Sequence, residues 1–128
     1  MTRPALYLSS PYGSDPANWL ANVNRQERAA DAAIRLGYAP IYPLSGHYVS
    51  ATCRELGHEP PDYDTWMEVS LALVARAEIL LRLPGHSPGA EREVAYAISL
   101  GLSVYDFHNR PVEGPELNRM RAIVEASR

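Results

Sequence analysis

Short apolar runs alternate along the chain with longer segments of helical periodicity. Ala5–Ser9 is apolar and ends in a Ser-Ser-Pro-Tyr-Gly turn, as expected of a buried strand. Asp15 and Pro16 form a helix start as cap and first helical residue, and Gly37 forms a stop. Further short strands are predicted at residues 38–42, 78–83 and 102–107. The pattern therefore predicts a series of strand–helix units.

Capping signals predict the later helices. Thr65-x-x-Glu68 is a capping-box pattern and predicts a helix that runs to about Ala77. Ser87 and Pro88 open another helix that ends at Gly101, and a last helix is predicted at 115–126.

Residues 43–61 are rich in Gly, Pro, Ser and His, which predicts an irregular loop of a length that is usually functional.

Strands alternating with helices predict an α/β fold with a doubly wound parallel sheet of four or five strands. The 128 residues suit a single domain that covers the whole sequence, 1–128. Ligands of such sheets bind outside the carboxyl ends of the strands. We therefore expect the turns at 9–13 and 84–89, which follow the first and third strands, to meet at one cleft.

Composition removes several classes of function. All twelve basic residues are Arg, so Schiff-base aldolases, pyridoxal phosphate enzymes and ordinary P-loops, which need a lysine amine, are excluded. A single Cys excludes an intramolecular disulfide and thiolate metal clusters, and no two of the four His have the i, i+4 spacing of a metal site. We expect no metal, no cofactor and a cytoplasmic location.

Charge and hydropathy narrow the choice of partner. The net charge is −3 and the arginines are scattered, which is unfavourable for binding polymeric nucleic acid. No apolar run approaches the roughly 18 residues of a membrane span, so we expect no membrane partner. A small molecule is therefore the class of partner that we expect.

The helix that begins at Pro88 carries the candidate chemistry. Its predicted core face follows i, i+4, i+7, i+8 spacing and consists of Ala90, Val94, Ala97, Ile98 and Gly101. Glu91 and Glu93 flank this face on opposite sides, so either carboxylate could reach a cleft. Gly89 lies one turn before Glu93 and leaves space above its carboxylate. The helix start at Ser87 offers N–H groups to an anion about 9 Å along the axis from Glu93.

These motifs, in this order, resemble the nucleoside 2-deoxyribosyltransferase superfamily over roughly residues 5–107. The resemblance rests on Tyr7-Leu8-Ser9-Ser10-Pro11-Tyr12, on Ser87-x-Gly89-x-x-x-Glu93 and on Ala97-x-x-x-Gly101. It is closest to the 2'-deoxynucleoside 5'-monophosphate N-glycosidases and to small uncharacterised relatives with a similar first turn.

The resemblance implies a flavodoxin-like fold and a catalytic Glu that attacks C1' of a deoxyribosyl group and expels the base. Glu93 matches that nucleophile, and Tyr7 matches the tyrosine that orients it; the sugar is then released to water or to another base. The substrate is a nucleotide or nucleoside. Candidate substrate-binding residues are Ser9, Ser10, Tyr12, Trp66, Ser87, Gly89 and Asn118, of which Tyr12 and Trp66 could stack on the base. Asn118 loosely matches a polar residue that relatives send into a neighbour's site, which implies a homodimer or higher oligomer.

Three positions depart from the pattern. Ser87 stands where the transferases that act on free nucleosides carry Asp, and a hydroxyl favours a 5'-phosphate that a carboxylate would repel. Ser70 and Glu78 replace two further family Asp residues, which supports an alternative: a nucleotide-binding module without catalysis. A flavodoxin-like electron carrier also fits the fold class but has no sequence signal for flavin. Ser87 as a simple helix cap and Tyr7 as a simple core residue are the competing structural interpretations.

Overall fold

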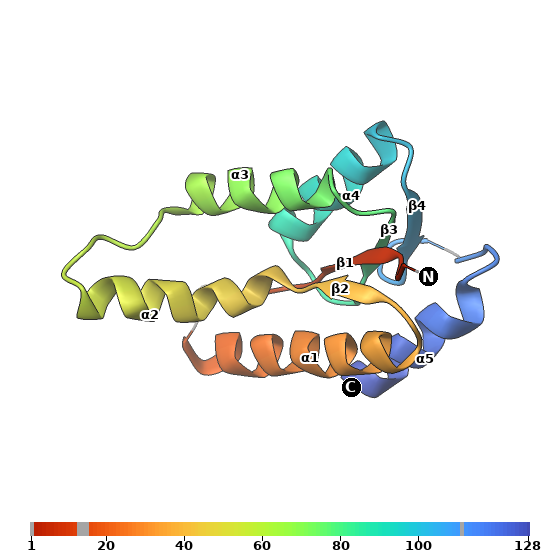
Figure 1. The fold of residues 1–128 in the computed structure, drawn as a ribbon, viewed down its shortest axis with the longest axis horizontal. Coiled ribbons are helices and arrows are strands. Elements are labelled where there is room, and N and C mark those ends of the chain that lie inside the picture. The colour runs from red at the N-terminus through yellow and green to blue at the C-terminus, as the bar shows by residue number, and fades with distance from the viewer. Residues whose placement is uncertain (1, 13–15, 111) are drawn as a thin grey trace.

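A four-stranded parallel sheet forms the centre of the computed structural model, which describes residues 2–12, 16–110 and 112–128. The strands are β1 (Ala5–Ser9), β2 (Ala39–Ile41), β3 (Ile79–Arg82) and β4 (Ser103–Asp106), in the order β2-β1-β3-β4. The predicted doubly wound α/β sheet is confirmed, and the arrangement is flavodoxin-like (Figure 1).

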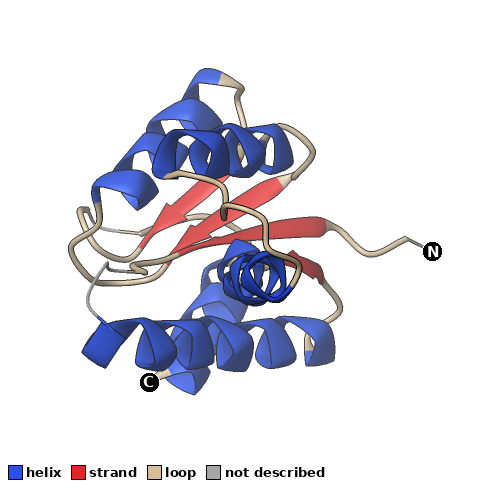
Figure 2. Cartoon of the chain, turned by 90° about the vertical axis from the view of Figure 1, so that its left-hand side faces the viewer, coloured by secondary structure: helices blue, strands red, loops and turns tan. Residues whose placement is uncertain are grey.

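Helices cover both faces of the sheet (Figure 2). In the described residues they are α1 (Pro16–Arg35), α2 (His47–Glu55), α3 (Tyr63–Val74), α4 (Pro88–Ser99) and α5 (Leu117–Ser127). Helices α1 and α5 lie against one face and α3 and α4 against the other, whereas α2 projects beyond the carboxyl ends of the strands (Figure 1). This projection places α2 over the edge at which ligands of such sheets bind.

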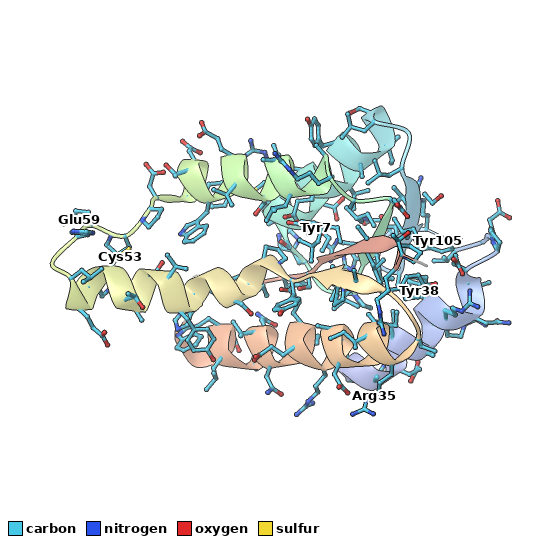
Figure 3. The ribbon with its side chains drawn as sticks, viewed as in Figure 1. Tyr7, Arg35, Tyr38, Cys53, Glu59 and Tyr105 are labelled. Atoms are coloured by element: carbon cyan, nitrogen blue, oxygen red, sulfur yellow. The ribbon has the colours of Figure 1, made fainter. Side chains whose placement is uncertain are left out.

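Each face of the sheet has its own apolar core because side chains alternate along the strands. Leu6 and Leu8 of β1 pack in the core that α1 and α5 cover, together with Leu81 and Met120. Tyr7 points the opposite way, into the core that α3 and α4 cover (Figure 3). The strands are apolar on both faces, as parallel strands between two helix layers must be.

The interpretation of residues 43–61 as an irregular loop was wrong. They contain a 3-10 helix, Pro43–Gly46, followed directly by α2. Helix α2 buries none of its residues fully, and the Gly, Pro, Ser and His residues of this segment favoured the interpretation as a loop. The ring of its first residue, His47, stacks on Trp19, with 3.7 Å between the two ring centroids.

Three helix details also differ from the predictions. The cap of α3 is Asp62, whose Oδ1 accepts a hydrogen bond from the Thr65 N–H at 2.8 Å, so Thr65 lies inside the helix and is not its cap. The helix ends at Val74, before the predicted Ala77. Ile98 of α4 is 49% exposed and is not a core residue, because Ala97 takes the buried position beside it.

Other predicted boundaries hold. Helix α1 begins at Pro16 and α4 begins at Pro88 with Ser87 as its cap. The predicted cap Asp15 and the end of the first turn at Gly13 lie outside the described residues.

Candidate active site

The site lies where the chain leaves β1 and β3 toward opposite faces of the sheet. Ser9 and Arg82 are the last residues of these neighbouring strands and are partners in the strand register. After Ser9 the chain continues to α1 on one face, and after Arg82 it continues to α4 on the other. The divergence opens a crevice at the carboxyl edge.

Glu93 lies at the bottom of this crevice and is anchored by two residues of β1. Its side chain comes from the second turn of α4, and the residue is 7% exposed. Tyr7 donates a hydrogen bond from its hydroxyl to Oε2, and Ser9 donates from Oγ to Oε1 at 2.8 Å. Each carboxylate oxygen therefore has one hydroxyl donor, which fixes the orientation of the group.

Opposing effects set the pKa of Glu93. Burial raises the pKa, whereas the hydrogen bonds from Tyr7 and Ser9 and the charge of Arg82 lower it; the net direction is upward from the ordinary value of 4.5. Burial and the charge of Glu93 raise the pKa of Tyr7 far above its ordinary value. Tyr7 therefore keeps its proton and acts as a donor to Glu93.

A pocket of about 690 Å³ opens above Glu93. Its walls come from the 3-10 helix and α2 on one side and from α3 and the start of α4 on the other. Six of the predicted site residues line it: Ser10, Tyr12, Trp66, Ser87, Gly89 and Glu93. The prediction that the first turn and Glu93 meet at one cleft is confirmed for the described part of that turn.

The start of α4 forms one end of the pocket. Ser87 Oγ accepts the Ala90 N–H at 3.1 Å, and the Ser87 carbonyl accepts the Glu91 N–H at 3.0 Å. The hydroxyl proton of Ser87 remains able to donate because capping uses only its acceptor side. Pro88 has no N–H, so Gly89 is the first-turn residue whose N–H has no acceptor among the described residues. Ser87 can thus cap the helix and donate to an anion at once.

Aromatic side chains line the mouth of the pocket. Tyr12 and His47 share a hydrogen bond of 2.9 Å between the Tyr12 hydroxyl and Nδ1, and the His47 ring stacks on Trp19. Trp66 lies against Gly46, where an added Cβ would come within 3.0 Å of the indole ring. These rings offer flat apolar surfaces on which a planar group can stack.

Ser9 and Asn118 were predicted to contact the substrate, but neither lines the pocket. Ser9 is fully buried behind Glu93 and does not line the pocket. Asn118 is exposed on α5. Its neighbours in the chain, Glu116 and Arg119, interact with Tyr38, which lies just before β2. That is the amino edge of the sheet, so Asn118 is remote from the pocket of its own chain.

Ser70 and Glu78, the two residues that replace Asp in the pattern of the resembling superfamily, are far apart. Ser70 lines the pocket and lowers the pKa of Tyr7, opposing the larger effects of burial and of the Glu93 charge. Glu78 is exposed and precedes β3, at the edge of the sheet opposite the pocket. Of Ser70 and Glu78, only Ser70 can contact a ligand bound above Glu93 in the same chain.

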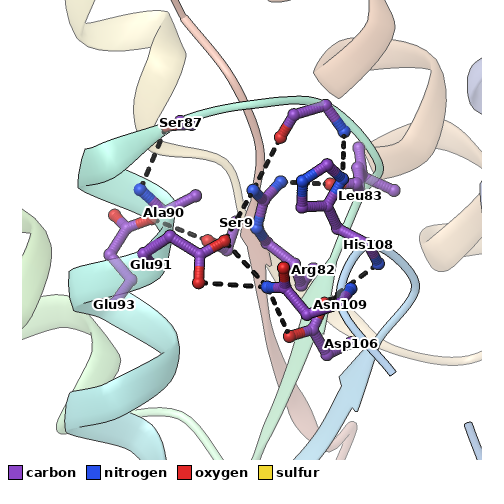
Figure 4. A network of polar contacts seen from close by, with 11 residues as sticks. Ser9, Arg82, Leu83, Ser87, Ala90, Glu91, Glu93, Asp106, His108 and Asn109 are labelled. Atoms are coloured by element: carbon purple, nitrogen blue, oxygen red, sulfur yellow. Dashed lines mark hydrogen bonds and ion pairs between the residues drawn. The ribbon is translucent and has the colours of Figure 1, made fainter. Parts of the chain in front are cut away.

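The structure also separates Glu91 from Glu93. Glu91 does not line the pocket; its carboxylate binds Arg82 at 3.2 Å and Asn109 at 2.8 Å (Figure 4). The hydrogen bonds from Asn109, together with Arg82, hold the pKa of Glu91 below its ordinary value. Glu93, which the sequence predicted as the nucleophile, is therefore the acid that lies in the cleft.

Sequence reasoning missed several buried polar residues, among them Arg82 and Gln26. Arg82 is fully buried at the end of β3. Gln26 of α1 donates to the Leu8 carbonyl at 3.0 Å and to Ser10 Oγ at 2.9 Å, and its own Oε1 accepts the Leu44 N–H at 2.9 Å. A charged residue that ends an apolar strand was the available signal for Arg82; Gln26 gives none, since polar residues are ordinary on a helix surface.

Within the described residues, no group of three or more His, Cys, Asp or Glu side chains is placed to hold a metal ion. None of the described helices is both long enough and apolar enough to cross a membrane. Comparisons of the chain with known protein families and with curated proteins found no match.

Proposed function

We propose that this protein is an N-glycosidase or deoxyribosyltransferase that cleaves the bond between base and sugar in a nucleoside 5'-monophosphate. One observation carries the proposal: Glu93 is a buried carboxylate with both oxygens held by hydroxyl donors, and it faces a pocket whose far end is a helix N-terminus. Ordered carboxylates of this kind serve as nucleophiles in retaining glycosidases. The resemblance to the nucleoside 2-deoxyribosyltransferase superfamily adds the substrate class.

In the first step, an oxygen of ionised Glu93 forms a bond to C1' while the bond from C1' to the base nitrogen breaks. The electron pair leaves with the base, which then takes up a proton from solvent water. The product is an ester between Glu93 and the sugar phosphate. Tyr7 and Ser9 are positioning residues that hold the carboxylate against C1'.

In the second step, water or a second base attacks C1', and the ester bond to Glu93 breaks. The electron pair returns to Glu93, which is again a carboxylate, and the attacking group loses its proton to solvent water. Hydrolysis and transfer differ only in the attacking group, so the residues around Glu93 serve both.

The 5'-phosphate is assigned to the start of α4. Ser87 lies six residues before Glu93, about 9 Å along the helix axis, which suits the separation of a 5'-phosphate from C1'. The Ser87 hydroxyl and the Gly89 N–H would donate to the phosphate, and the helix dipole favours its charge. Tyr12 and Trp66 would then contact the base on the apolar walls.

A nucleotide-binding module without catalysis is the second candidate. It is favoured by Ser70, which stands in the pocket where the resembling family carries an acid. The same pocket would then bind a nucleotide without expelling the base.

Incubation with the four deoxynucleoside and four ribonucleoside 5'-monophosphates, with chromatography of released base, tests the proposal. We expect release from at least one nucleotide by the wild type and by Glu125→Gln, an exposed control on α5, but none by Glu93→Gln. Nucleotide binding by calorimetry should survive Glu93→Gln, because the amide keeps the volume of the side chain but cannot attack C1'. Binding without release by the wild type would favour the non-catalytic module, and absence of both would refute the nucleotide site.

A further inference from the structure

We propose that Arg82 is a positioning residue for the phosphate end of the site: its buried guanidinium holds the loop between β3 and α4 in the shape that binds a 5'-phosphate. The inference rests on the proposed function. The loop comprises residues 83–87 and leads directly into the first turn of α4. Arg82 contacts the loop from the sheet side, behind the pocket wall.

The guanidinium bridges the start of the loop, its middle and the following helix. Nη1 donates to the Leu83 carbonyl, and Nη2 donates to the Gly85 carbonyl at 2.6 Å and to Glu91 Oε1 at 3.2 Å. The Arg82 side chain is completely buried, whereas the Glu91 carboxylate that it binds is partly exposed. A planar guanidinium can reach several acceptors in fixed directions, which a lysine ammonium cannot reproduce.

Gly85 is held on its other sides as well. Its φ of +127° lies in the region that favours glycine, and an added Cβ would come 2.5 Å from Cγ of Pro11. Its N–H donates to Nδ1 of His108 at 3.0 Å, so the ring proton of neutral His108 is on Nε2. The loop is thus fixed between Arg82, His108 and the turn that follows β1.

The partners of Gly85 and Arg82 are joined to each other (Figure 4). Asp106 accepts the His108 N–H at 2.9 Å and the Asn109 side chain at 3.1 Å. Asn109 also donates to both oxygens of Glu91, which in turn binds Arg82. A closed ring of polar contacts therefore connects β3, β4, the loop and α4.

This ring is separate from the anchors of Glu93. Ser87 is two residues beyond Gly85, so the position of the loop determines where the Ser87 hydroxyl and the Gly89 N–H point. Glu93 is anchored to β1 through Tyr7 and Ser9 and has no hydrogen bond to the ring among the described residues. Loosening the loop should therefore weaken phosphate binding more than it disturbs Glu93.

Arg82→Lys tests the inference, because it keeps the charge near Glu93 while losing the bridging geometry. Arg92→Lys, at an exposed position of α4, is the matched control. The affinity of Arg82→Lys for a deoxynucleoside 5'-monophosphate should fall about tenfold or more, as for lost charge-assisted hydrogen bonds, while affinity for the corresponding nucleoside changes less than about twofold. A general loss of folded protein would reduce both alike.

Amide hydrogen exchange gives a readout without any ligand. In Arg82→Lys the Gly85 N–H should exchange faster than in the wild type and in Arg92→Lys, while the amides of β1 remain protected. His108→Ala, at an exposed residue, should have the same effect and serves if Arg82→Lys does not fold. Unchanged exchange at Gly85, or equal losses of nucleotide and nucleoside affinity, would overturn the inference. If the wild type binds no nucleotide, the proposed function and the phosphate role fail together, and exchange alone decides whether Arg82 orders the loop.

Discussion

The hydroxyl of Ser9 donates a hydrogen bond to Oε1 of Glu93 at 2.8 Å, although the two residues are 84 positions apart in the chain. The contact joins the last residue of β1 to the second turn of α4. With the Tyr7 hydroxyl on the other oxygen, it holds a buried carboxylate in one orientation beneath the pocket. The orientation of the proposed nucleophile therefore depends on β1 as much as on its own helix.

Ser9→Ala should slow base release and shift its pH dependence. The hydrogen bond from Ser9 lowers the pKa of Glu93, so its loss raises that pKa and moves the acid limb of the kcat/KM profile to higher pH. We expect kcat to fall roughly tenfold, as for loss of a hydrogen bond to a charged group. Ser103→Ala, at an exposed position of β4, is the control; an unshifted acid limb would contradict a positioning role for Ser9.

Glu93 should make the stability of the protein depend on pH. Its pKa in the folded state is raised above the ordinary value of 4.5, so the folded state binds this proton more tightly than the unfolded state does. Stability is therefore lost as the pH rises from about 4.5 through the raised pKa. Glu93→Gln lacks this titration, so its free energy of unfolding relative to the wild type should increase over that range and then level off. Urea titrations from pH 4 to pH 8 measure the difference, and parallel curves for the two proteins would rule out the raised pKa.

Ser87→Asp should change the preferred substrate. A carboxylate can still accept the Ala90 N–H as a helix cap but repels a 5'-phosphate. We expect the ratio of kcat/KM for a deoxynucleoside monophosphate to that for the nucleoside to fall by roughly a hundredfold, the loss of about two charge-assisted hydrogen bonds. Ser87→Asn caps the helix without the charge and should retain more of the preference. A ratio that is the same in all three proteins would show that the phosphate binds elsewhere.

Gly89→Ala should separate ligand binding from stability. An added Cβ would lie 3.5 Å from Met67 Sδ and from the Tyr63 hydroxyl, which is ordinary contact, so the fold accommodates it. Alanine favours helix more than glycine by up to about 1 kcal/mol, so thermal stability should stay the same or rise. The methyl group enters the pocket beside the start of α4, so nucleotide affinity should fall. Calorimetry and thermal melts measure the two effects, and unchanged affinity would place the ligand away from Gly89.

The protein should form a homodimer or a higher oligomer. Val69 of α3 and Ile98 of α4 are exposed apolar residues on the same helix layer, and a second copy would cover them. Light scattering at micromolar concentration measures the state, and Ile98→Glu should shift it toward the monomer. If Asn118 enters a neighbour's site, mixing inactive Glu93→Gln with Asn118→Ala should restore activity above that of either alone. A wild-type monomer that binds nucleotide would refute the prediction.

The local sequence was enough to predict the order of strands and helices and most of their boundaries. Apolar runs and capping residues such as Ser87 act over a few positions, so their effects can be read without knowing the rest of the chain. Helix α2 was missed because it buries no residue completely and is held by the contact between His47 and Trp19. Trp19 lies 28 positions before His47, so no local pattern reports this contact.

Only the tertiary structure shows how each of the two acids of α4 is held. Helix periodicity alone leaves Glu91 and Glu93 equivalent, since both flank the core face of α4, whereas the space beside Gly89 and the resemblance favoured Glu93. Packing of α4 against β1 turns Glu93 toward Tyr7 and Ser9, while Arg82 and Asn109 hold Glu91 outside the pocket. The burial of Arg82 likewise follows from the packing of β3, β4 and α4. Burial of a charge depends on partners that are distant in the chain, so the local sequence does not predict it.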